Sequence, residues 1–213
     1  MRTKHQFEAA WVNPTPASHW DSISFDDGEQ FPNSMNLFQV SIGQDGPKGV
    51  RRLLDTSMVR GGQFPPPQTF KVNRVLFTFS AATSDKMVYS FAESTVWEFR
   101  ISDVRRLRNP LIALQQNREG IAPFRICQFC RAVWVMASTC PGCGARQFTL
   151  SSLAQSDERT GRQFFLDLPD DRALLIQPCE SFVLGLMTHG LFVAEGPFRM
   201  WAHLEGFEDS ILC

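Results

Sequence analysis

The sequence lacks the features that mark several large classes of protein. No apolar run is long enough to span a bilayer, and residues 1–14 lack the apolar stretch of a secretory signal peptide. The H-E-x-x-H, G-x-S-x-G, G-x-G-x-x-G and P-loop motifs are all missing. We therefore expect a chain that folds in the cytoplasm, has no transmembrane segment and is not an enzyme.

The chain also lacks a strong net charge, because its formal charge at pH 7 is −1. Dedicated nucleic-acid-binding domains usually carry a marked basic excess, so this balance argues against that role. The four histidines stand singly, and His203 falls on the polar face of a predicted strand, where we expect a surface or hydrogen-bonded core residue. No spacing supports Cys179 and His189 as a nucleophile and its base.

Two C-x2-C pairs separated by nine residues are the most informative motif in the chain. Paired C-x2-C spacing is typical of a tetrahedral zinc site with four thiolate ligands, which leaves no position for a catalytic water. The same four sulfurs would suit a single iron ion, disulfides in an oxidising compartment, or one redox-active pair. We expect structural zinc, held by Cys127, Cys130, Cys140 and Cys143.

Alternation of apolar and polar residues predicts an all-β protein. Val75, Phe77 and Phe79 share one face of a segment, and Phe198 and Met200 share one face of another. Many short strands separated by Gly and Pro predict an antiparallel β-sandwich. Trp97, Phe99 and Ile101 alternate in the same way in a strand expected at 94–102. Further strands are expected at 147–151, 163–168, 173–177, 181–187 and 191–194, and one short helix at 102–116, broken by a proline.

The predicted elements divide the chain into three parts. Residues 1–60 are rich in Pro, Gly and scattered aromatic residues, which predicts an N-terminal arm and a loop-rich lead-in. Residues 61–213 form the sandwich, and residues 121–150 form a zinc ribbon inserted within it. No internal repeat or low-complexity tract is present.

Arginines are concentrated around the cysteines. Residues 104–146 hold seven arginines and a single acid, whereas acids exceed bases from residue 157 onward. The arginine excess would partly balance the −2 charge of a four-thiolate zinc site, or attract acidic regions of like copies. It would also suit phosphate contacts. The candidate nucleic-acid-binding residues are Arg105, Arg106, Arg108, Arg131 and Arg146.

Two segments, residues 55–79 and 173–207, resemble the opening and closing strands of jelly-roll capsid proteins from tailless icosahedral phages with internal membranes. In the first, a Gly/Pro-rich loop leads into a core strand. The second has an I-x-P-x-x-x-F strand followed by a V-x-L-x-G-like strand. The matching residues are Ile176, Pro178 and Phe182, then Ala202, Leu204 and Gly206.

The resemblance implies a virion structural protein that self-assembles through a single jelly roll, since the chain is too short for two. Its partners would be copies of itself and other virion proteins, with an inner face toward lipid or genome. The arm, with Trp11, Trp20 and Phe25, would reach onto a neighbour. The zinc ribbon would stiffen an interface or surface loop. The alternative is a nucleic-acid-associated zinc-ribbon protein with a β domain.

Overall fold

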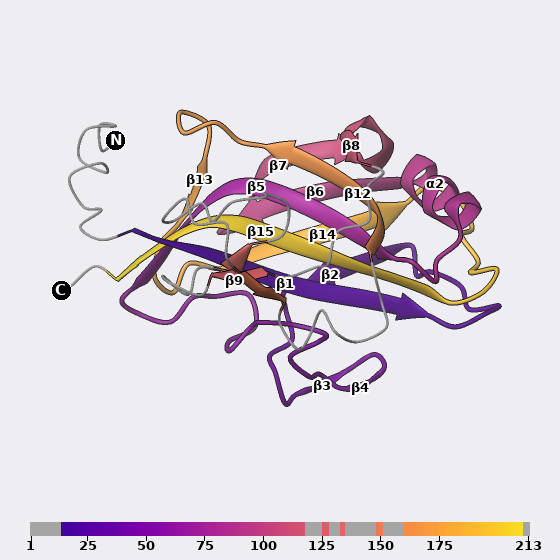
Figure 1. The fold of residues 1–213 in the computed structure, drawn as a ribbon, viewed down its shortest axis with the longest axis horizontal. Helices are drawn as coiled ribbons and strands as arrows, with labels where there is room; N and C mark the ends of the chain where they lie inside the picture. Colours follow the sequence, from indigo (N-terminus) through magenta and orange to yellow (C-terminus); the bar gives the residue numbers. More distant parts are fainter. Residues whose placement is uncertain (1–13, 118–124, 128–132, 135–147, 151–159, 211–213) are drawn as a thin grey trace.

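The computed structural model describes residues 14–117, 125–127, 133–134, 148–150 and 160–210. This part of the chain is mostly β-strand, with one α-helix, and all its strand pairs are antiparallel. Two sheets pack face to face, as Figure 1 shows. The predicted all-β class with antiparallel sheets is therefore confirmed. Within the described ranges, no helix is long and apolar enough to cross a membrane.

The larger sheet has the order β1-β15-β5-β12-β8, and a short strand, β13, also pairs with β5. All eleven residues of β1 pair with β15. The strands are β1 (Thr15–Phe25), β5 (Gln68–Ser80), β8 (Gln115–Asn117), β12 (Thr160–Asp167), β13 (Leu174–Ile176) and β15 (Phe198–Ser210).

The second sheet has the order β2-β14-β6-β7. Its strands are β2 (Ser34–Leu37), β6 (Thr95–Ile101), β7 (Val104–Pro110) and β14 (Phe182–Thr188). The described ranges also contain two smaller sheets. One has the order β10-β9-β11, with β9 (Arg125–Cys127), β10 (Val133–Trp134) and β11 (Phe148–Leu150), and the other pairs β3 (Asp45–Gly46) with β4 (Gly49–Val50).

Aromatic side chains from both sheets fill the space between them. Phe77 of β5 meets Trp97 of β6 with ring centroids 5.5 Å apart, and both side chains are fully buried. At one end of the sandwich, Phe91 of α2 (Asp85–Ser94) contacts Phe198 at 4.9 Å and Phe31 at 5.2 Å. The alternating apolar residues that the sequence singled out on β5, β6 and β15 are all in this core.

The predicted helix at 102–116 is wrong. This segment contains β7, a single 3-10 turn at Leu111–Ala113, and β8. Ser102 and Asp103 both have positive φ, 49° and 62°, which makes the tight turn between β6 and β7. The α-helix lies instead at Asp85–Ser94, where Ser84 caps it by accepting from the Met87 amide at 3.3 Å.

The range expected to be a loop-rich lead-in supplies β1 and β2 to the two sheets. Trp20 and Phe25, which were expected to reach onto a neighbouring copy, are buried within their own chain. The Trp20 indole N–H donates to the Leu53 carbonyl at 3.0 Å, and the Phe25 ring contacts Phe198 at 5.9 Å. Trp11 lies outside the described residues.

Candidate functional site

The cysteine quartet belongs to the chain that joins β8 to β12. Cys127 is the last residue of β9, where only its backbone is described, and Cys130, Cys140 and Cys143 lie outside the described residues. β9 and β10 pair antiparallel, with Val133 opposite Ile126, so Cys127 ends one of these strands and Cys130 falls between the two in the chain. The second C-x2-C pair falls between β10 and β11 in the chain. Structural zinc at these cysteines stays a prediction.

Elsewhere in the described part of the chain, no group of three or more His, Cys, Asp or Glu residues is placed to hold a metal ion. Cys179, whose residue is exposed, has a left-handed backbone with φ 59° and donates its amide to the Phe64 carbonyl at 3.0 Å. His189 is also exposed. No metal-binding role follows for either residue from their surroundings.

Three of the five arginines singled out for nucleic-acid binding lie on β7, at the edge of the second sheet. Arg105, Arg106 and Arg108 are exposed, whereas Arg131 and Arg146 lie outside the described residues. Charged side chains on an edge strand also prevent unwanted pairing with other strands. The arginines of β7 therefore suit either a phosphate contact or the protection of a sheet edge.

Glu98 gives part of this arginine group a structural role. Its side chain is 1% exposed, on the outward face of β6, and its carboxylate is paired with Arg100 and with Arg105, whose Nε lies 3.1 Å away. A buried carboxylate without a cation would be costly, so these two arginines are held by the fold itself. Arg106 and Arg108 are the exposed cations of β7 outside this cluster.

The acid-rich C-terminal region is partly neutralised within the chain, which weakens the expected attraction between like copies. Four of its acids form ion pairs with Arg or Lys side chains, and a fifth bonds a histidine. The pairs are Asp167 and Glu205 with Arg74, Asp170 with Lys71, Glu195 with Lys86, and Glu208 with His19.

The last of these pairs forms part of a Ser–His–Glu cluster that sequence reasoning missed. His19 Nε2 bonds the Glu208 carboxylate, and His19 Nδ1 lies 3.5 Å from the Ser57 hydroxyl oxygen. That oxygen accepts from the Trp20 amide at 2.9 Å. The His19 ring sits against Phe64 at 4.6 Å. In sequence, 189 residues separate His19 from Glu208, so no local pattern could have linked them.

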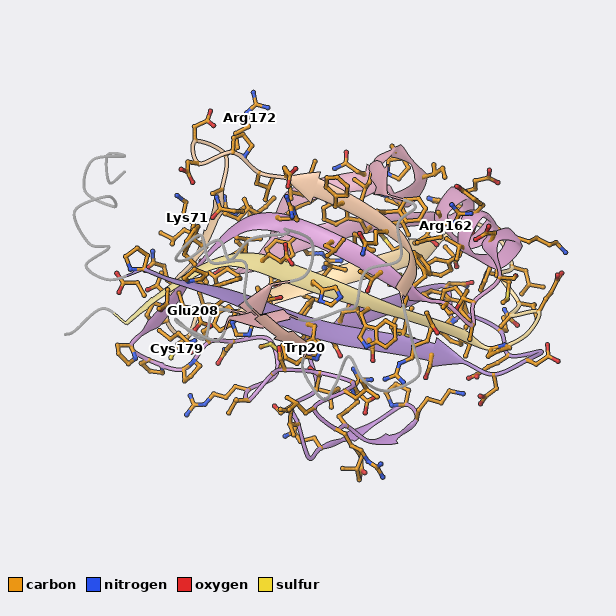
Figure 2. The ribbon with its side chains drawn as sticks, in the orientation of Figure 1. Trp20, Lys71, Arg162, Arg172, Cys179 and Glu208 are labelled. Atoms are coloured by element: carbon orange, nitrogen blue, oxygen red, sulfur yellow. The ribbon has the colours of Figure 1, made fainter. Side chains whose placement is uncertain are left out.

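This cluster joins β1, β15 and the chain before β5 at the end of the sandwich where Figure 2 labels Glu208 and Cys179. The serine hydroxyl is already engaged with the Trp20 backbone, with its carbonyl at 3.4 Å as well as the amide. A nucleophile needs a short hydrogen bond to its base and a free path to substrate. The geometry therefore fits a set of hydrogen bonds that hold β1, β15 and the chain before β5 together better than it fits a catalytic triad.

His203 is completely buried on β15, so of the two positions expected for it the core position is correct. Its Nε2 lies 3.0 Å from the Thr78 hydroxyl, and burial lowers its pKa from 6.5 to about 3. The imidazole is thus neutral throughout the physiological range.

Comparison of the chain with protein-family models, curated proteins and solved structures found no match.

Proposed function

We propose that this chain is a single jelly roll that serves as the structural subunit of a virion shell, with a structural zinc ribbon in the insertion between β8 and β12. The observation that carries the proposal is the pairing of the eight main strands. In chain order these are β1, β2, β5, β6, β7, β12, β14 and β15.

The first strand pairs with the eighth and the third with the sixth, both in the larger sheet. The second pairs with the seventh and the fourth with the fifth, both in the second sheet. This arrangement arises when an antiparallel ribbon of four strand pairs is wound so that successive pairs enter opposite layers. The double Greek key of a jelly roll has this pairing, which supports the proposal of a single jelly roll.

The step from this fold to a shell subunit is an analogy, because lectin domains and cupins use jelly rolls too. The resemblance to phage capsid proteins favours the shell. Its motif residues Ile176, Phe182, Ala202 and Leu204 are buried in the core between the sheets. They therefore fit the role that the opening and closing strands have in those proteins.

A shell subunit needs surfaces that neighbouring copies can bury. Large apolar side chains are exposed on two connections, the chain between β2 and β5 and the chain between β14 and β15. Val59 is 75% exposed and Leu191 is 71% exposed. Exposed apolar side chains on loops are what an interface between subunits would cover. On these two connections the exposed large apolar residues are Ile42, Val50, Leu53, Val59, Leu191 and Val193, and Val104 at the start of β7 is exposed as well.

The test compares the assembly of the purified chain with that of two charged variants. Sedimentation should show large assemblies for the unchanged chain, whereas Val59→Asp and Leu191→Asp should shift it toward the monomer without lowering the melting temperature. Ala81→Asp, which adds the same charge at another exposed position, is the control. A chain that remains monomeric in every form would refute the proposal.

Arg106 and Arg108 support a second candidate, a nucleic-acid-associated protein. Both are exposed on one edge strand and lie outside the Glu98 cluster. Contacts of this kind give binding that weakens steeply with salt. Arg106→Glu with Arg108→Glu should then abolish binding to single-stranded DNA or RNA in fluorescence polarisation. Binding that is absent, or unchanged in the double variant, would leave the arginines as protection of the sheet edge.

A further inference from the structure

The outer face of the larger sheet is buried, which a two-layer sandwich does not by itself explain. Leu76, Thr78 and His203 are 0% exposed and Trp201 is 1% exposed. The large apolar residues of this row, Leu76 and Trp201, are not members of the core between the sheets. The outer face of an antiparallel sheet is commonly solvated, so something must cover these side chains.

The segment at residues 53–55 covers only one part of this face. The Trp201 indole N–H donates to the Leu54 carbonyl at 3.1 Å, and the Trp20 indole N–H donates to that of Leu53. Trp20 and Trp201 come from β1 and β15, at one side of the sheet. Leu76 and Thr78 lie farther in, on β5.

Topology identifies the remaining cover. The small sheet β10-β9-β11 lies in the chain between β8 and β12, which are neighbours at one edge of the larger sheet. Yet β10 comes within 8 Å of β1, at the opposite edge, measured between Cα atoms. The three strand spacings from β12 to β1 amount to about 14 Å. The second sheet fills the inner face of the larger sheet, so the outer face is the one across which β10 can reach β1.

We propose that the small sheet β10-β9-β11 packs on the outer face of the larger sheet of its own chain, over Leu76, Thr78 and His203. Figure 1 shows β9 in front of β15 and β1, in agreement with this placement. The described strands of the insertion then form a third layer within the same chain. It differs from the loop contact with neighbouring copies that the sequence suggested.

Gln163 adds a polar observation to the topological one. It lies on β12 beside Thr78, is 1% exposed, and its amide nitrogen and oxygen have no hydrogen-bond partner within the described part of the chain. A buried amide of this kind is expensive unless it is bonded. Its burial shows that the outer face of the larger sheet is covered beside Thr78 as well. In an assembled shell, which rests on the proposed function, this face would be closed to neighbouring subunits.

The test places a photo-crosslinker on each outer face of the full-length protein. Phe165 is half-buried and lies opposite Leu76, so replacing it with p-benzoylphenylalanine probes the larger sheet. Val183, half-buried on the outward side of β14, receives the same probe as a control. Irradiation should link position 165, but not position 183, to residues 125–150 of the same chain. Mixing nitrogen-15-labelled and unlabelled protein separates links within a chain from links between chains.

Links from position 165 that are absent, or that run only to a second chain, would overturn the proposal. Carbethoxylation of the unmodified protein gives a second reading, because exposed His189 should react readily while covered His203 stays unmodified. Equal reaction at both histidines would also overturn it. Links within the chain are expected for a monomer as well as for a shell, so a failure to assemble leaves this inference intact.

Discussion

Removing the Asp21 carboxylate should destabilise the fold more than any exposed ion pair could. Asp21 is 3% exposed and pairs with Arg51, and its carboxylate also accepts from the Phe38 amide at 2.5 Å and the Ser22 amide at 2.9 Å. Arg51 in turn donates to the Ser22 carbonyl at 3.0 Å. This network attaches the chain after β4 to β1, and it holds Phe38 at its positive φ of 68°.

In Asp21→Ala, the half-buried Arg51 guanidinium would lose its charge partner and keep only the Ser22 and Asp55 carbonyls, and the Phe38 amide would lose its acceptor. Breaking a buried ion pair from one side costs about 3–5 kcal/mol, and the lost backbone acceptor places this case well within that range. Urea unfolding followed by circular dichroism should show the midpoint falling by roughly 1–2 M for an m-value of about 2–3 kcal/mol/M. Asp21→Ala with Arg51→Met should cost less than the sum of the two single changes, because neither charge is then left unpaired.

The matched control is Asp26→Ala, since the Asp26 side chain is 90% exposed and pairs with Lys48 at 3.0 Å. An exposed pair contributes only about 0–1 kcal/mol, so this variant should unfold almost as the unchanged protein does. If Asp21→Ala cost no more than Asp26→Ala, the reasoning about the buried network would be wrong.

Three further outcomes follow from the structure. The pKa of His203 is lowered to about 3 in the folded protein, so below pH 6.5 the unfolded state binds more protons than the folded state. The free energy of unfolding should therefore fall by about 2 kcal/mol between pH 7 and pH 5. His203→Gln should flatten this pH dependence in urea titrations, and an equal slope in the variant would contradict the reasoning. Gly206→Ala would place a Cβ onto the Lys71 carbonyl oxygen, whereas in Gly185→Ala the nearest atom is the Glu98 side chain at 3.4 Å, so the first should lower the melting temperature far more than the second, and equal losses would count against the described register. Cys140→Ser should remove bound zinc, as measured by mass spectrometry of the metal. Near-ultraviolet circular dichroism should show that the sandwich core stays folded. Loss of the whole fold would contradict the prediction that the metal site belongs to a separate insertion.

Strand positions were predictable for β5, β6, β14 and β15, where apolar residues alternate along the strand, but not for β1 and β2, which also face the core. In β5 and β15 the apolar residues recur with period two because the space between the sheets accepts only one side of each strand. The same rule failed at 104–110, where exposed arginines alternate with little apolar content, and an edge strand was taken for a helix. The true helix is short, and its buried residues Met87, Val88, Phe91 and Ala92 give only two turns of pattern.

Contacts between distant parts of the chain could not be predicted from the sequence. The partners of Asp21 and His19 lie 30 and 189 residues away, respectively, so their pairing depends on the strand order and not on a local motif. The burial of His203 and Thr78 on an outward face is equally non-local, because it depends on what packs above the sheet. Two statements about chemistry rest on the sequence alone: the cysteine spacing predicts zinc, and the arginine excess would also suit phosphate contacts.

The mass of the purified 213-residue chain in sedimentation equilibrium, over its whole soluble concentration range, tests the proposed shell subunit most directly. We expect a closed assembly many times heavier than the 24.1 kDa chain, formed without any added partner. A single species of 24.1 kDa at every concentration would contradict it.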